Sequence, residues 1–185
     1  MDRLGTKRIE TERLILRRFT IEDAEPMFQN WASDPEVTKF LTWQPHQSVA
    51  VTKELISLWV SEYDKPDCYQ WAIELKEIGE PIGSIAVVSV DERTSAAEMG
   101  YCMSRAHWGR GLMPEALRAV MDFLFDEVGF KRVCAKHDAE NPKSGRVMQK
   151  AGMRLEGVHR RAGFNNRGVI DVVVYGAILD DRKQP

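Results

Sequence analysis

The pattern of apolar and polar residues divides the chain into strands and helices. Alternating or short continuous apolar runs predict strands over residues 13–19, 69–75, 81–90, 96–104, 132–138, 153–161 and 168–179. Apolar residues at three- and four-residue spacing predict helices over residues 21–32, 49–63, 112–128 and 141–151. The order is a strand, two helices, three strands, a helix, a strand, a helix and two strands. It indicates a mixed α/β sheet flanked by helices rather than a doubly wound fold.

The start of the third helix carries the first candidate chemistry. In "HWGRGLMPEALRAV", Gly109 and Gly111 flank Arg110 just before the helix, and Pro114 fits its first turn. Free backbone N–H groups and the positive end of the helix dipole favour an anion at this place. The alternative is a simple turn with a flexible lead-in. Spacing excludes a Walker loop, and a dinucleotide fingerprint needs a third small residue where Pro114 stands.

Composition narrows the class of protein without identifying it. A chain of 185 residues, 43% hydrophobic and 29% charged, is expected to form one globular domain over residues 1–185. The net charge of −2 gives no reason to expect a nucleic-acid or membrane partner. Three cysteines without a close pair exclude a complete disulfide framework and favour a reducing cytoplasm. Four scattered histidines and the lack of an HExxH motif lead us to expect no metal.

Segments along nearly the whole chain resemble a known family. "WGRGLMPEAL" looks like the pyrophosphate-binding loop of the GCN5-related N-acetyltransferases (GNAT), which bind acetyl-coenzyme A (acetyl-CoA). Other segments resemble the ribosomal-protein N-acetyltransferase (RimJ/RimL) branch of that family: "TERLILR", "FLTWQPH", "AEMGYCM", "NPKSGRVMQKAGM" and "LEGVHR". Each segment alone is weak evidence, but their shared order along the chain is strong evidence.

The resemblance implies a fold, a co-substrate and the residues that bind it. The implied fold is a mixed, mostly antiparallel sheet, splayed at its middle, in which the pantetheine arm of acetyl-CoA binds like an added strand. The expected contacts are Met103, Arg105, Trp108, Gly109, Arg110, Gly111, Leu112, Met113 and Asn141. For Asn141, a helix N-cap is the simpler role. Ala106 stands where the family often has Gln or Arg, and we expect binding to survive because backbone amides do most of the work in such loops.

Two residues are candidates for proton transfer. Glu98 is the candidate base or amine-positioning group, acting through water, and an exposed strand charge is the alternative. The resemblance places Ser144 near the coenzyme sulfur as a proton donor to the leaving thiolate, and an ordinary serine in a first helical turn is the alternative. Many acetyltransferases use a tyrosine as this acid, but Met148 occupies the corresponding position and cannot donate a proton.

Aromatic residues of the first half are candidates for an acceptor groove, with core packing as the alternative for each. The candidates are Trp31, Phe40, His46 and Tyr69, with Trp43 and Trp71 near them in the sequence. His46 lies in a polar segment, where an ordinary loop position is the simpler interpretation. The segment "VHRRAGFNNRG" contains Arg160, Arg161 and Arg167 and is interpreted as a solvated hairpin. The alternative is that these arginines contact an acidic acceptor or the coenzyme's 3′-phosphate.

The leading interpretation is a cytoplasmic enzyme that moves an acetyl group from acetyl-CoA to a primary amine. The favoured acceptor is the N-terminal α-amine of a protein. A small-molecule amine, such as an antibiotic or a polyamine, is the alternative within this class. A non-catalytic acetyl-CoA sensor is the alternative outside it. The family resemblance implies a monomer or a homodimer.

Overall fold

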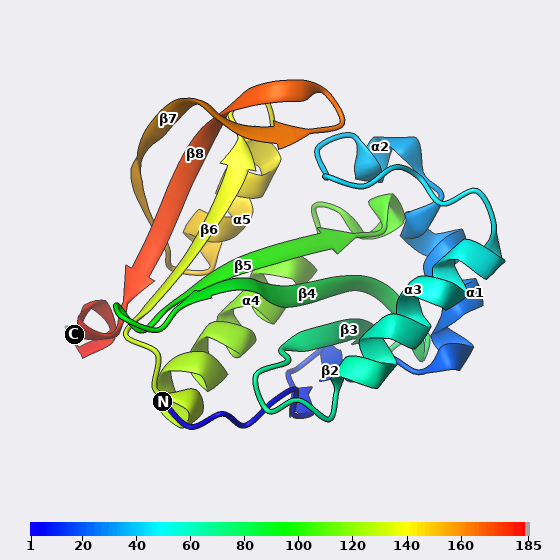
Figure 1. Ribbon diagram of the computed structural model, residues 1–185, viewed down its shortest axis with the longest axis horizontal. Helices are drawn as coiled ribbons and strands as arrows, with labels where there is room; N and C mark the ends of the chain where they lie inside the picture. The colour runs from blue at the N-terminus through cyan, green and yellow to red at the C-terminus, as the bar shows by residue number, and fades with distance from the viewer. Residues whose placement is uncertain (184–185) are drawn as a thin grey trace.

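The computed structural model describes residues 1–183 and arranges them around one eight-stranded sheet (Figure 1). The strands are β1 (Ile9–Glu10), β2 (Leu14–Arg17), β3 (Gln70–Leu75), β4 (Glu80–Asp91), β5 (Ala96–Met103), β6 (Arg132–Asp138), β7 (Arg154–Asn165) and β8 (Gly168–Ile178). Their order in space is β1-β2-β3-β4-β5-β6-β8-β7. Only β5 and β6 pair in parallel among these strands. The predicted mixed, mostly antiparallel sheet is confirmed.

Helices cover the two faces of the sheet and bury two apolar clusters. The α-helices are α1 (Ala24–Met27), α2 (Pro35–Thr38), α3 (Val49–Glu62), α4 (Leu112–Phe123) and α5 (Pro142–Lys150). Alternation along β3 sends Trp71 and Ile73 into the cluster beneath α4 and α5, and Ala72 into the cluster beneath α1 and α3. Within residues 1–183, no helix is both long and apolar enough to cross a membrane.

The single parallel pair opens into a fork. β5 and β6 pair from Ala96 opposite Arg132 as far as Met99 opposite Ala135. Beyond this point β5 stays on β4 as far as Met103, while β6 stays on β8. Figure 1 shows the two strands diverging toward their carboxyl ends. The splay that the family resemblance implied therefore begins directly after Met99.

The first predicted helix, residues 21–32, is irregular. It consists of a 3-10 turn, η1 (Ile21–Asp23), then α1, and then a π-helical turn, η2 (Phe28–Ala32). Pro26 has no N–H to donate and its ring crowds the preceding turn, so a regular hydrogen-bond ladder cannot run through the segment. β1 and α2 were not predicted because they are too short to show a periodic pattern.

Candidate active site

The glycine loop before α4 has the backbone that its sequence indicates. Gly109 has φ +77° and Gly111, the N-cap of α4, has φ +76°. Both angles lie in the left-handed region, which favours glycine over other residues. The N–H groups of Gly111, Leu112 and Met113 open the helix, where they lack an acceptor one turn back. Pro114, next in the turn, has no N–H to satisfy. The loop thus presents a row of donors at the positive end of the α4 dipole.

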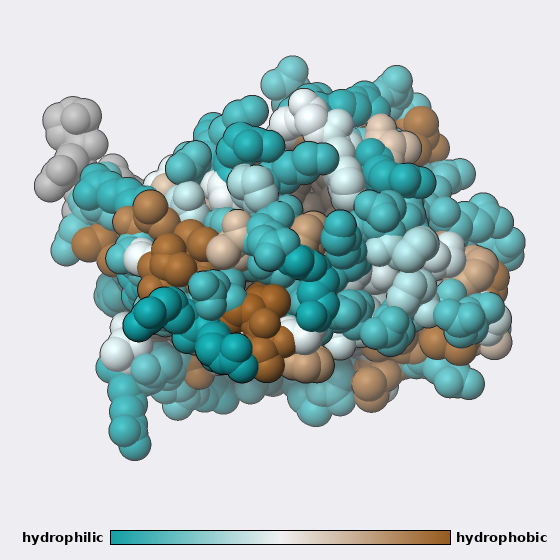
Figure 2. All heavy atoms as spheres, turned by 90° about the horizontal axis from the view of Figure 1, so that it is seen from above, coloured by the Kyte–Doolittle hydropathy of each residue, from teal (hydrophilic) through white to brown (hydrophobic). Residues whose placement is uncertain are grey.

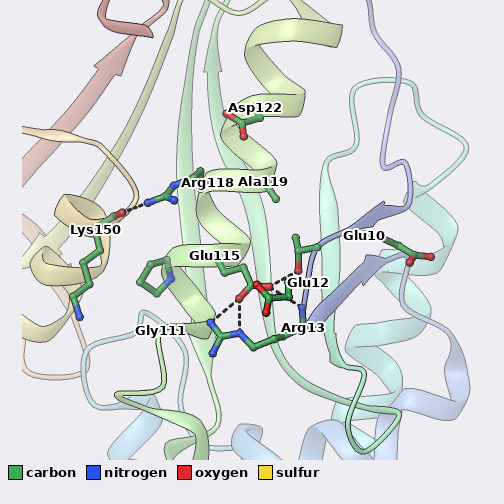
Figure 3. Close-up of a pocket in the computed structure, with 11 residues that line it drawn as sticks. Glu10, Glu12, Arg13, Gly111, Glu115, Arg118, Ala119, Asp122 and Lys150 are labelled. Atoms are coloured by element: carbon green, nitrogen blue, oxygen red, sulfur yellow. Dashed lines mark hydrogen bonds and ion pairs between the residues drawn. The ribbon is translucent and has the colours of Figure 1, made fainter. Parts of the chain in front are cut away.

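An ion pair from the other end of the chain clamps this loop. The Glu115 carboxylate accepts hydrogen bonds from Thr11 Oγ1 at 2.6 Å and from the Arg13 backbone N–H at 2.9 Å. The Arg13 guanidinium binds the same carboxylate at 2.6 Å and 2.7 Å, and donates to the Arg110 carbonyl at 2.9 Å. Figure 3 shows dashed lines joining Arg13 to Glu115 next to Gly111. Nothing in the apolar pattern of "TERLILR" revealed this role of Arg13.

The clamp borders an open pocket of about 690 Å³ on the outer side of α4. The pocket lies between the β1–β2 turn and the carboxyl end of α5, where Arg118 donates to the Lys150 carbonyl at 2.5 Å (Figure 3). It therefore lies beside the glycine loop and away from the fork.

Two charged residues of the predicted cofactor site have protein partners. Arg105, in η3 (Arg105–His107), binds Asp34 at the start of α2, with Nε and Oδ2 3.1 Å apart. Arg110 binds Glu77 at 3.1 Å. The Arg110–Glu77 pair is exposed, and Arg105 is exposed beside a half-buried Asp34, so the two pairs contribute little to stability. They tie the loop to the two segments next to it.

The carboxyl end of β5 forms one wall of the fork. Its edge toward β6 is unpaired beyond Met99 in the described structure, so backbone groups there are open to an added strand. The Met103 side chain is buried, and its carbonyl accepts from Trp108 Nε1 at 2.8 Å. Trp108 is 39% exposed, with Lys143 of α5 over its ring. The indole therefore lies between the glycine loop and the start of α5.

The other wall ends in the first turn of α5. Asn141 is its N-cap residue, but the described structure records no hydrogen bond from the Asn141 side chain. Its amide is thus available to a ligand, which favours the binding role over capping. Ser144 is half-buried, and its hydroxyl lies 3.0 Å from the Tyr101 hydroxyl on β5. Met148 is fully within the core, so the position at which the family often has tyrosine contributes packing alone.

Glu98 lies on the opposite face of the sheet from Ser144. Its neighbours in β5, Ala97 and Met99, point into the cluster beneath α4, so Glu98 points the other way. The carboxylate binds Lys136 of β6 at 2.6 Å. This contact places a cation next to the candidate base, one residue before the fork opens.

The structure separates the candidate acceptor residues. Trp31 is 0% exposed in the cluster beneath α1 and α3, and Tyr69 is 4% exposed in the cluster beneath α4. These two are corrected to core residues, because full burial leaves no surface for a substrate. Phe40 and His46 are half-buried in the segment after α2. Burial lowers the pKa of His46, whose Nδ1 lies 2.8 Å from Thr52 Oγ1.

The tip of the β7–β8 hairpin holds the segment that carries Phe40 and His46. Asn166 donates from its backbone to the Leu41 carbonyl at 3.0 Å, and from its amide to the Thr38 and Trp43 carbonyls at 2.9 Å and 2.7 Å. Arg167 is exposed, lies over the Phe40 ring and is paired with Asp138 and Glu140. Sequence reasoning missed Asn166, since a turn is the common place for asparagine.

The face that carries this hairpin tip is mainly hydrophilic (Figure 2). The large exposed apolar side chains of β7 and β8 are Leu155, Val158, Phe164, Val169 and Ile178. Figure 2 shows the apolar residues of this face in separate patches, so it does not present one large apolar surface.

Comparisons with known proteins agree with this geometry. Residues 13–154 match the family model described as an acetyltransferase (GNAT) domain. An uncharacterized N-acetyltransferase, p20 of Bacillus licheniformis, is 32% identical over 91% of this chain and 94% of its own. The ribosomal-protein-serine acetyltransferase of Escherichia coli (strain K12) is 31% identical over 56% of this chain and 58% of its own. A solved structure of RimL, a ribosomal L7/L12 alpha-N-protein acetyltransferase in complex with coenzyme A, has a TM-score of 0.83 at 21% identity, covering 94% of this chain and 99% of that one.

The left-handed glycine at the start of α4 leads to a first prediction. Gly111→Ala and Gly129→Ala both force alanine into a left-handed backbone, at φ +76° and +89°, at opposite ends of the helix region. Each should cost about 1–2 kcal/mol of stability. Only Gly111→Ala is expected to weaken acetyl-CoA binding, by about tenfold or more, because it displaces backbone donors. Isothermal titration calorimetry measures this, and equal affinities in the two variants would contradict it.

The clamp leads to a second prediction, on acid stability. Burial opposes ionisation of Glu115, but hydrogen bonds from Thr11 and Arg13 outweigh it and lower the pKa below its usual 4.5. A lowered folded-state pKa contributes stability above the unfolded value and loses it as the pH falls through the folded value. Glu115→Gln should therefore destabilise the protein by about 1–3 kcal/mol at neutral pH, and by progressively less below about pH 4.5.

Urea unfolding at a series of pH values measures this difference. Glu77→Gln is the matched control, since the exposed Glu77–Arg110 pair should contribute under about 1 kcal/mol at any pH. A Glu115→Gln deficit that stays constant down to acid pH would show that the carboxylate charge is not involved.

Proposed function

Because this chain belongs to the GNAT family of N-acetyltransferases, we propose that it moves the acetyl group of acetyl-CoA to the α-amine at a protein N-terminus. Acetyl-CoA supplies the activated acetyl group and the thiol leaving group. The main observation in support of this proposal is the fork between β5 and β6. It has an open β5 edge on one side, the uncommitted Asn141 amide on the other, and the α4 donors at its mouth.

These groups fit the parts of acetyl-CoA. The N–H groups at Gly109 to Met113 bind the pyrophosphate, with Arg13 and Glu115 holding the loop in place. The unpaired backbone of β5 holds the pantetheine arm as an added strand, and the Asn141 amide binds it from the opposite wall. Trp108 and Lys143 close the gap between the loop and α5.

The two proton-transfer residues work from opposite faces of the sheet. As the nitrogen–carbon bond forms and the carbon–sulfur bond breaks, sulfur leaves with the electron pair. Ser144 passes its hydroxyl proton to this sulfur and regains one from solvent. On the other face, Glu98, which is paired with Lys136, takes the proton of the amine through water. The products are an amide and a free thiol.

The similarity to ribosomal-protein acetyltransferases favours a protein N-terminus over a small amine. The Asn166 contacts join the segment after α2 to the β7–β8 hairpin, so these two elements together form the proposed acceptor side. We further propose that residues 1–185 act as one cytoplasmic domain, as a monomer or a homodimer.

An acceptor panel tests the proposed function. Peptides with free N-termini, the same peptides with blocked N-termini and one internal lysine, an aminoglycoside and spermidine are each offered with acetyl-CoA, and thiol release is followed. We expect release with free N-termini alone. Faster release with the aminoglycoside or spermidine would replace the proposal with a small-molecule acceptor. Tight acetyl-CoA binding without transfer to any amine would identify a sensor.

The hairpin contact gives a separate prediction for the acceptor. Asn166→Ala removes the hydrogen bonds that the Asn166 amide donates to the α2 segment and the one that its oxygen accepts from the Gln44 amide. Their loss loosens the segment with Phe40 and His46. The KM for the peptide should rise about tenfold, because the loosened segment positions the acceptor less well, with the KM for acetyl-CoA unchanged. Gln47→Ala is the control, because Gln47 lies in the same segment and its side chain bonds, within residues 1–183, to the neighbouring Pro45 carbonyl alone. A rise in the KM for acetyl-CoA instead would show that the Asn166 contact serves acetyl-CoA binding.

A further inference from the structure

We propose that Tyr101 is a positioning residue that orients the hydroxyl of Ser144 toward the reacting sulfur. The inference rests on the role proposed above for Ser144 and adds a second residue to it. Tyr101 belongs to β5, one wall of the fork, whereas Ser144 belongs to α5, which follows the other wall.

The contact bridges the two walls where they are no longer hydrogen-bonded to each other. Tyr101 lies two residues beyond Met99, the last residue of β5 that pairs with β6. Its hydroxyl lies 3.0 Å from Ser144 Oγ and 3.2 Å from the Ser144 carbonyl oxygen. Alternation puts the Tyr101 ring on the face of α4 and α5, together with Met99.

The proposal requires one direction of this hydrogen bond. Burial raises the pKa of Tyr101 above its usual 10, so the phenol keeps its proton throughout the neutral range and can donate it. In the proposed arrangement the phenol O–H donates to Ser144 Oγ rather than to the Ser144 carbonyl. With its lone pair engaged, the Ser144 hydroxyl directs its own hydrogen away from Tyr101, into the fork. A donor to the oxygen also polarises the Ser144 O–H bond and makes it a better donor in turn.

The arrangement compensates for the missing tyrosine in α5. Met148 cannot donate a proton, and it is buried under the sheet. Tyr101 brings a phenol to the same helix from β5, but it reaches the sulfur only through Ser144. The chain also contains an internal control for this geometry. Tyr175 of β8 places its hydroxyl against the same helix, where it accepts from Gln149 Nε2 at 3.1 Å.

The test compares Tyr101→Phe, Ser144→Ala, the double variant and Tyr175→Phe in the full chain. Both Phe variants keep the ring and remove one hydroxyl facing α5. With acetyl-CoA and a peptide with a free N-terminal serine, we expect kcat to fall about tenfold in Tyr101→Phe and at least as far in Ser144→Ala. The double variant should equal Ser144→Ala, because the two residues act as one unit. Tyr175→Phe should stay within about twofold of the unchanged chain, and the KM for acetyl-CoA should not change in any of the four.

Three results would overturn the proposal. One is an unchanged kcat in Tyr101→Phe. Another is a fall in the double variant equal to the product of the two single effects, since Tyr101 would then act independently of Ser144. The third is a change confined to the acetyl-CoA KM, which would make Tyr101 a binding residue.

A second measurement needs no acceptor, so it separates this inference from the proposed function. The pKa of the thiol of bound coenzyme A is measured from thiolate ultraviolet absorbance. A hydroxyl that donates to sulfur stabilises the thiolate, so this pKa should be higher in Tyr101→Phe, and at least as high in Ser144→Ala, than in the unchanged chain or Tyr175→Phe. If the thiol pKa shifts in this way but no N-terminal peptide is acetylated, the acceptor proposal fails and the positioning role stands. If peptides are acetylated and the thiol pKa is the same in all four proteins, the positioning role fails.

Discussion

The whole site depends on one constraint, that β5 and β6 are parallel strands whose pairing stops after Met99 and Ala135. Parallel neighbours need a long crossover, and here α4 provides it, so the start of α4 must lie at the carboxyl end of β5. The same connection that builds the sheet thus delivers the helix dipole to the mouth of the fork. Beyond the separation, backbone groups of β5 that face β6 have no strand partner in the described structure. A ligand with its own amide groups can form hydrogen bonds with them.

The remaining contacts stabilise this open geometry from outside. A fork has few cross-strand hydrogen bonds, so its shape is held by residues that are distant in sequence. Glu115 joins the β1–β2 turn to α4, and Asn166 joins the β7–β8 hairpin to the segment after α2. Tyr101 and Ser144 connect the two walls directly. Each of these contacts places a polar group beside an element of the proposed acetyl-CoA or acceptor site.

Most of the fold was predictable because its long elements have strong patterns. The strands that became β3 to β8 and the helices that became α3 to α5 were each located to within a few residues. The segment over 21–32 was predicted as one helix, but Pro26 divides it into three kinds of turn, which a 3.6-residue period cannot show. For the site, Gly109 and Gly111 were predictable because a left-handed backbone before a helix favours glycine, which can be recognised in the sequence.

The sequence by itself determined the class of fold, the family and the place of the glycine loop, because periodicity and backbone requirements act over short stretches of chain. Only the tertiary structure decided which side chains serve the site. It moved Trp31 and Tyr69 into the core, paired Glu98 with Lys136, and brought Tyr101 to Ser144. These outcomes depend on contacts between residues far apart in the chain, and side-chain chemistry alone does not say which distant residue will be the neighbour.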